Sequence, residues 1–317
     1  MPELIWLKTP KMNKITFLLL FVLTACYHAE SDPTPKINTA LQDRYFKNLP
    51  SPFSPLSPSE RGKDWGKEYQ IALSFARELD LYQALTGFKR AEYLTPPPER
   101  HLEIDYNIFM CYYIGGKYAE AIYTFENTGL RSVSSSLPAH QDLLVTLYDC
   151  YLRVDLHEKA DRVLSYIQQL YPDTAEKLFL SGELIQGNIS ALEKSSEPAV
   201  QTLLAHYNKE KKSIKTAQLF NTFIPGSGYL YVGQTQSALT SFFLNGLFIW
   251  ASVHFFQHGN MAAGAIFTSF ETGWYFGGIY GAGQEAKFYN ERVYERLITP
   301  MMNEKRLFPI LMITHAF

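Results

Sequence analysis

The sequence predicts an all-α protein in which a solenoid of helical repeats is followed by an apolar helical hairpin. Two observations carry this prediction. Between Trp65 and Pro172, apolar residues recur at helical spacing in pairs of short segments. Residues 237–256 then form a run of membrane-spanning length without Asp, Glu, Lys or Arg. The 317 residues are enough for two units of ordinary size.

The balance of charges argues against nucleic-acid binding. A formal net charge of -2 provides no basic field that attracts phosphate. The 21 Tyr and 22 Phe suit either helix packing or a membrane interface. Three cysteines are too few for a disulfide framework.

The N-terminus has the order of a bacterial export signal. Residues 12–26, MNKITFLLLFVLTAC, combine Lys14 with an apolar run that is too short to span a bilayer comfortably. The last four residues resemble the lipobox of bacterial lipoproteins: Leu23, Thr24, Ala25 and Cys26. This resemblance implies that residues 1–25 are a signal peptide and that the Cys26 thiol receives lipid, with palmitate as its acyl chain. The alternative is an ordinary signal or anchor segment with an incidental cysteine.

These residues predict a membrane-anchored lipoprotein of the bacterial cell envelope. Tyr27 follows the cysteine, in place of the Asp that retains some lipoproteins in the inner membrane. The choice between inner and outer membrane stays open. Residues 26–63 are rich in Pro and Ser and have no amphipathic period, so we expect an extended tether there.

Three segments within residues 64–206 carry the same offsets around an alanine. Ala84, Ala121 and Ala160 each follow an aromatic residue by nine positions. The full set of anchors is Ala84, Phe88, Ala91, Tyr112, Ala121, Phe125, Tyr151 and Ala160. The offsets resemble the tetratricopeptide repeat (TPR), in which two antiparallel helices cross closely at an alanine. The alternative is a generic helical bundle.

Cys111 and Cys150 lie ten residues before their alanines, where Ser74 stands in the first segment. Small side chains at one repeat position favour structural filling. A metal or redox pair is the other interpretation, but neighbouring repeats usually hold such positions beyond disulfide reach.

Residues 207–296 predict a membrane-associated hairpin with basic flanks, followed by a tail at residues 297–317. Gly273, Gly277 and Gly281 stand four apart and fall on one helix face, where another helix can approach closely. Glu271 would be costly in lipid and is a functional candidate. A hydrogen bond to Asn245 or Trp274, or protonation, is the other explanation. The hairpin could also be buried in a soluble body.

The opening of this segment, Pro225-Gly226-Ser227-Gly228, resembles the start of small two-helix membrane modules in bacterial proteins. The charges around the hairpin indicate a membrane topology that conflicts with the one that the export signal predicts. Lys and Arg occupy both flanks and are absent from the connecting loop, an arrangement that places the flanks in the cytoplasm. An interfacial position would remove this conflict.

The sequence contains no pattern typical of an enzyme, and we expect no catalytic residue, cofactor or metal. His254 and His258 lack accompanying ligands at metal-site spacing. The TPR resemblance implies a scaffold or adaptor that binds a protein or peptide in its groove, in envelope assembly or secretion, with membrane lipid as a second partner. The alternative is an oligomeric membrane channel or gate, built on the glycine face, with the repeats as sensor.

Overall fold

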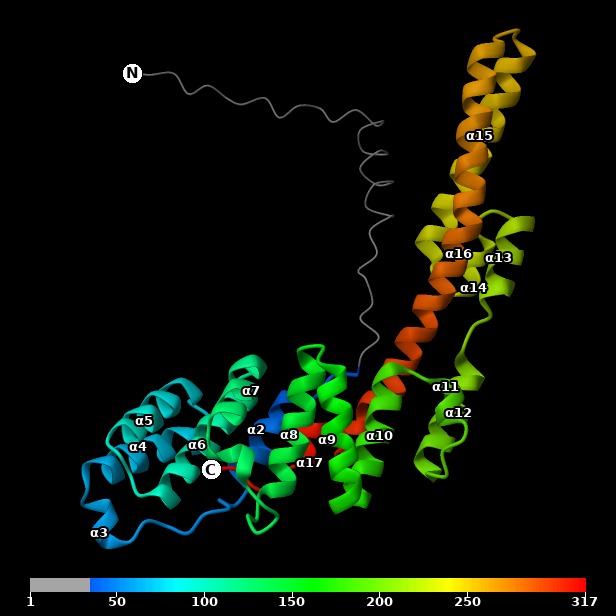
Figure 1. Cartoon of the computed structure of the whole chain (residues 1–317). Coiled ribbons are helices and arrows are strands. Elements are labelled where there is room, and N and C mark those ends of the chain that lie inside the picture. Colours follow the sequence, from blue (N-terminus) through cyan, green and yellow to red (C-terminus); the bar gives the residue numbers. More distant parts are fainter. Residues whose placement is uncertain (1–34) are drawn as a thin grey trace, which may run out of the picture. The chain divides into compact units, whose positions relative to one another are not determined.

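The computed structural model describes residues 35–317, and these form helices and no strand (Figure 1). The all-α prediction is therefore confirmed for this part of the chain. The described residues divide into two compact units. The repeat unit contains residues 35–201 and Ile298–Phe317, and the hairpin unit contains Thr202–Leu297. The lipobox, Leu23 to Cys26, lies outside the described residues.

Successive pairs of helices build most of the repeat unit (Figure 1). They follow two short N-terminal helices, α2 (Thr39–Lys47) and α3 (Pro58–Arg61). The pairs are α4 (Asp64–Glu78) with α5 (Leu81–Tyr93), α6 (Pro98–Ile114) with α7 (Tyr118–Asn127), and α8 (His140–Arg153) with α9 (His157–Leu170). The 3-10 turn η1 (Gly129–Ser132), α10 (Pro172–Gln186), α11 (Ile189–Leu192) and the C-terminal α17 (Pro309–Met312) complete the unit.

The two helices of each pair are joined by the same type of turn. The residue five positions before each anchor alanine has a left-handed backbone, with φ of 65° at Leu79, 70° at Gly116 and 59° at Asp155. The next amide donates to the carbonyl of the aromatic residue nine positions before the alanine. The donor–acceptor distances are 2.9, 2.8 and 2.9 Å. This bond caps the first helix of each pair and reverses the chain.

The anchor alanines lie in the core of the repeat unit. Ala84, Ala121 and Ala160 have no exposed surface. In the first pair a Cβ atom added to Gly87 would lie 2.8 Å from the Cβ of Ala72, which leaves no room for a larger side chain. Cys111 and Cys150 are free and buried, whereas Ser74 is exposed. Filling by small side chains at this position therefore fits the two cysteines and is wrong for Ser74.

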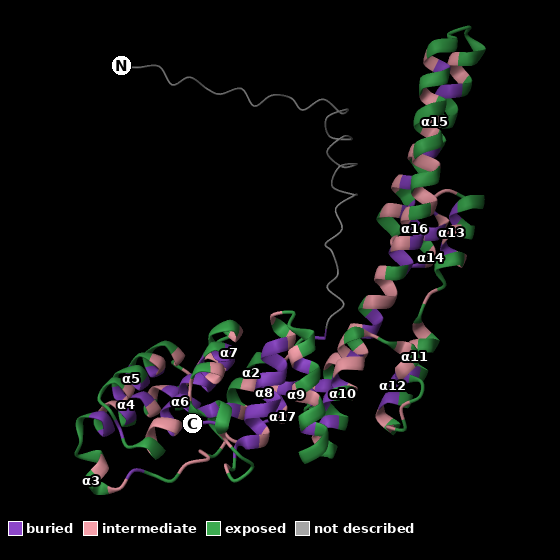
Figure 2. Ribbon diagram, in the orientation of Figure 1, coloured by how far each residue is buried: buried purple, intermediate pink, exposed green. Residues whose placement is uncertain are grey.

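The first helices of the second and third pairs are buried on all sides. Consecutive buried residues run from Glu103 to Cys111 in α6 and from Asp142 to Tyr151 in α8 (Figure 2). A helix can bury its whole circumference only if other elements cover both of its sides. The second helices cover one side, and the terminal segments of the repeat unit cover the other.

These terminal segments belong to the main hydrophobic core. Phe46 of α2, Leu56, and the C-terminal Ile313, Ala316 and Phe317 are all buried in it. The extended tether expected over residues 26–63 is therefore wrong for the described residues 35–63. Its prolines do break regular structure, but apolar side chains such as Phe46 and Leu56 belong to the same core as residues of α4, α6 and α8.

The hairpin unit is built around two long helices. Its elements are α12 (Pro198–Glu210), α13 (Ile214–Phe223), α14 (Ser227–Tyr231), α15 (Thr235–Gln257) and α16 (Met261–Glu304). Residues 198–201 of α12 and 298–304 of α16 are assigned to the repeat unit. The turn before α16 uses Gly259 at φ 78°. Phe255 and Phe267 stack across the hairpin with 5.3 Å between ring centroids.

The glycines of the Pro-Gly-Ser-Gly motif allow close packing. A Cβ on Gly226 would lie 2.2 Å from the carbonyl oxygen of Ala238, and one on Gly228 equally close to that of Ala217. Asn221 accepts a hydrogen bond from the Gly226 amide at 2.8 Å. The motif therefore holds α14 against α13 and α15.

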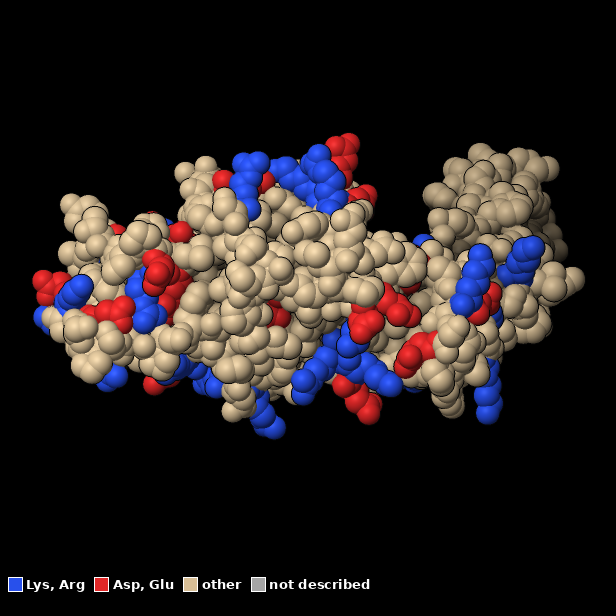
Figure 3. All heavy atoms as spheres, turned by 60° about the horizontal axis from the view of Figure 1, so that its bottom comes forward, with Lys and Arg blue, Asp and Glu red and all other residues tan. Residues whose placement is uncertain are grey.

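Within the described part of the chain, α15 alone is long and apolar enough to cross a membrane. Only 22% of its most apolar window is buried, which distinguishes it from a typical core helix of a soluble protein. No Asp, Glu, Lys or Arg occurs between Thr216 and Phe270. On the face drawn in Figure 3, charged side chains of both signs mix over the repeat unit, whereas the far end of the hairpin unit carries none.

Candidate functional site

The eight repeat anchors lie between helices rather than around a ligand site. Ala84, Phe88, Ala91, Ala121 and Ala160 have no exposed surface. Tyr151 is also buried, and Tyr112 and Phe125 are partly buried against the same core. The anchors therefore position the helices. The functional candidates are the surfaces that these helices present.

One such surface is the side of α6 and α8 opposite the second helices, which we call the covered face. It includes Arg100, Glu103, Tyr106 and Asp142. Residues 313–317 lie on it outside any helix, and the backbone of Ile313 is extended. Asp142, 1% exposed, accepts hydrogen bonds from the backbone amides of Thr314 and His315, both at 2.9 Å.

Further contacts fix the C-terminal residues in place. His315 Nδ1 lies 2.9 Å from the Asp142 carboxylate. The Ala316 amide donates to the carbonyl oxygen of Pro50 at 3.0 Å, and the Tyr45 hydroxyl donates to that of Ile313. Burial raises the pKa of Asp142, while the hydrogen bonds from His315 and Thr314 oppose that rise.

Arg100 holds the N-terminal segment against the same face. Its guanidinium bonds to Glu60 at 2.9 Å, to Glu103 at 2.6 Å and to the Ser54 carbonyl at 2.8 Å. The Arg100 hydrogen bond lowers the pKa of Glu60 to about 2. Burial raises the pKa of Glu103, whose carboxylate also accepts a hydrogen bond from the Tyr69 hydroxyl. Arg100 thus links the segment before α4 to α6.

The covered face therefore has the chemistry of a site for extended peptide. A buried carboxylate accepts hydrogen bonds from two consecutive backbone amides. Such bonds do not depend on the side chains of the bound segment. Apolar contacts then select side chains, as with Phe317, which is 4% exposed. In this structure the bound segment is the chain's own C-terminus.

The glycine face of the hairpin has two different parts. A Cβ on Gly281 would lie 2.2 Å from the Tyr229 hydroxyl oxygen, so a larger residue there would displace the end of the Tyr229 side chain. Added Cβ atoms on Gly273 and Gly277 would meet nothing within 4 Å. All three glycines border a cavity of about 440 Å³ that Tyr229 and Glu285 also line. The expected helix contact along all three glycines is therefore found only at Gly281.

Glu271 is partly buried on α16, and its Oε2 atom has no hydrogen-bond partner. The alternative explanation of a bond to Asn245 is not found in the structure, where the Asn245 amide donates to the Ser241 carbonyl at 2.6 Å and its Oδ1 atom has no partner. Glu271 does not line the cavity beside Gly273 and Gly277.

Comparison of the chain with protein-family models, with curated proteins and with solved structures finds no match. Function is therefore inferred from the residues and their geometry.

Asp142 and Arg100 were not among the predicted site residues. Their helices hold other charged residues as well, such as Glu99 beside Arg100 and Asp149 after Asp142, so the sequence did not single them out. Such a residue becomes informative only when its partner is known. The partners, Thr314 and His315 for one and Glu60 for the other, lie 172, 173 and 40 positions away along the chain.

Proposed function

We propose that this chain is a non-enzymatic adaptor lipoprotein of the bacterial envelope that binds an extended protein or peptide segment on its covered face. The observation that carries the proposal is that residues 313–317 lie on that face. The backbone amides of Thr314 and His315 donate hydrogen bonds to Asp142 there. The TPR resemblance of the helix pairs supports a protein or peptide partner. A partner segment would take the place of the C-terminal residues.

Two attachments would keep the adaptor at the membrane. Cys26 would carry lipid, and α15 exposes large apolar side chains such as Phe243 and Trp250, 66% and 63% exposed. One acyl chain alone gives reversible binding, whereas two attachments give a stable one. Incorporation of labelled palmitate into the chain, and its loss in Cys26→Ser, tests the lipid attachment. Equal incorporation in both would contradict it.

Photo-crosslinking in cells tests the adaptor proposal. Tyr45 contacts the C-terminal residues, so a benzophenone amino acid in its place reports what lies on the covered face. We expect it to link to a second protein when residues 309–317 are deleted, and far less in the full chain. The matched control is Tyr93, the last residue of α5. Its side chain is 87% exposed, and it is not among the residues of the covered face. Equal crosslinking at Tyr45 with and without the C-terminal residues would contradict the proposal.

The open glycines favour one alternative, an oligomeric membrane module. Because a Cβ added to Gly273 or Gly277 would meet no atom of the described residues within 4 Å, a second copy could approach there. Replacement of Gly277 by Leu would then abolish crosslinks between hairpins. It would leave partner capture by an adaptor intact.

A further inference from the structure

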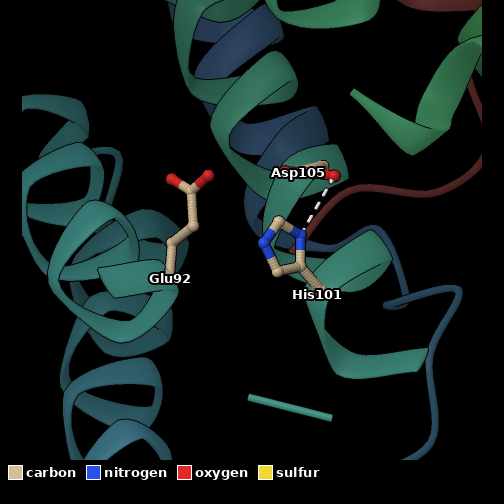
Figure 4. Close-up of side chains that lie close together, drawn as sticks. All are labelled: Glu92, His101 and Asp105. Carbon is tan, nitrogen blue, oxygen red and sulfur yellow. Dashed lines mark hydrogen bonds and ion pairs between the residues drawn. The ribbon is translucent and has the colours of Figure 1, made fainter. Parts of the chain in front are cut away.

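A second group of side chains stands together at the junction of the first two helix pairs. Glu92 lies near the end of α5, and His101 and Asp105 lie in the first two turns of α6. The spacing of four places His101 and Asp105 on one helix face. The turn between the helices passes through Thr95, with φ of 51°, and brings Glu92 opposite them. Figure 4 shows the imidazole of His101 between the two carboxylates.

The three side chains lie close to the separation that one metal ion requires. One ligand atom from each residue lies within 4.8 Å of the other two. Two atoms bound at about 2.0–2.2 Å to one tetrahedral Zn²⁺ lie about 3.3–3.6 Å apart. Rotation of the Glu92 side chain, which is only partly buried, would bring its carboxylate to that separation.

The burial of Asp105 is a second, independent observation that favours a cation at this place. Its side chain is 3% exposed, yet its Oδ1 atom has no hydrogen-bond partner. Its contact with His101 Nδ1 is long, at 3.4 Å, and the backbone amide of Gly129 also interacts with the carboxylate. A buried carboxylate without a full set of partners is costly, and a cation would balance it.

The neighbouring cation does not fill this role. Lys89 lies one helical turn before Glu92, but its ammonium donates to the Tyr112 hydroxyl at 2.7 Å. His101, with 44% of its side chain exposed, leaves one side of the cluster open to water. Water can therefore supply the remaining ligands.

We propose that Glu92, His101 and Asp105 bind a divalent transition-metal ion, Zn²⁺ in particular. One imidazole nitrogen and two carboxylate oxygens suit Zn²⁺ better than Ca²⁺ or Mg²⁺, which prefer all-oxygen sites. The ion would tie the end of α5 to the start of α6 and so fix the angle between the first two helix pairs. This site lies apart from the covered face and was not expected from the sequence.

Calorimetric titration of the purified full chain with ZnCl₂ in detergent tests the proposal. We expect one site whose affinity falls at least tenfold in His101→Gln and in Glu92→Gln. Both side chains are partly exposed, so neither substitution opens a core cavity. The matched control is the double variant His254→Gln, His258→Gln, whose rings lie 4.2 Å apart and are the other candidate for adventitious Zn²⁺.

X-ray absorption of the zinc-loaded chain gives a second readout. We expect one nitrogen and at least two oxygens at about 2.0–2.2 Å, with the nitrogen signal lost in His101→Gln. Absence of binding to the full chain would overturn the proposal. So would binding that persists in His101→Gln, or that disappears in the His254, His258 double variant.

Discussion

Buried charges at single residues decide how the terminal segments attach to the helix pairs. Glu103 and Asp142 are 3% and 1% exposed, and each is satisfied by donors that involve a terminal segment. Arg100 bridges Glu103 to Glu60, and Thr314 with His315 donates to Asp142. Removing a donor would leave a carboxylate buried without compensation, which costs more than the bond itself contributes.

Replacement of Arg100 by Ala is expected to reduce the free energy of unfolding by about 3 kcal/mol, because Glu103 would keep its burial and lose its ion pair. The free energy of unfolding of Arg100→Lys should lie between those of the wild type and the Ala variant, since lysine keeps the charge but not the forked geometry. Denaturant titration monitored by helix content measures both. A loss below about 0.5 kcal/mol for the Ala variant, the range of ordinary surface substitutions, would contradict this role.

Glu60 gives the ion pair a defined pH dependence. Its pKa of about 2 lies below the ordinary value of 4.5 because of Arg100. A lowered pKa stabilises the folded state above the ordinary value, and this stabilisation disappears as the pH falls through 4.5 toward 2. We expect wild type to be more stable than Glu60→Gln at pH 7, with the difference shrinking below pH 4.5. A difference that stays constant from pH 7 to pH 2 would argue against the pair.

The helix pairs could be predicted from the sequence because their signals are local. Alanines and aromatics at fixed offsets mark the crossing of two adjacent helices, and Ala84, Ala121 and Ala160 are indeed fully buried. The helix α2 could not be predicted in this way. Phe46 and Leu56 become buried only against α4, α6 and the C-terminal residues, and the surrounding prolines indicated an extended segment.

At the left-handed position of the turn, opposite effects are expected for two substitutions in different helix pairs. Asp155 pays the strain of a left-handed backbone, with φ of 59°, while 94% of its side chain is exposed. Asp155→Gly should therefore stabilise the chain by about 0.5–1 kcal/mol. Gly116→Ala should destabilise it by about 1 kcal/mol at the equivalent position, where φ is 70°. Thermal unfolding of both variants measures this, and shifts of the same sign would show that the turns are not equivalent.

At the scale of the whole molecule, the two compact units have different surfaces. The repeat unit carries mixed charges and covers its own candidate binding face with residues from both ends of its sequence. The hairpin unit exposes an uncharged apolar helix, α15. The apolar run was evident in the sequence because composition alone reveals it. The covered face was not, because it depends on contacts between residues such as Asp142 and His315, 173 positions apart.

The central claim is that the C-terminal residues occupy a site for extended peptide. The most direct measurement is the binding of a fluorescent peptide of residues 307–317 to the chain that lacks residues 309–317. We predict saturable binding that weakens at least tenfold, or about 1.4 kcal/mol, in Asp142→Ala. The full chain should not bind, because its own C-terminus competes at high effective concentration. Equal binding to the full and shortened chains, or no effect of Asp142→Ala, would contradict the claim.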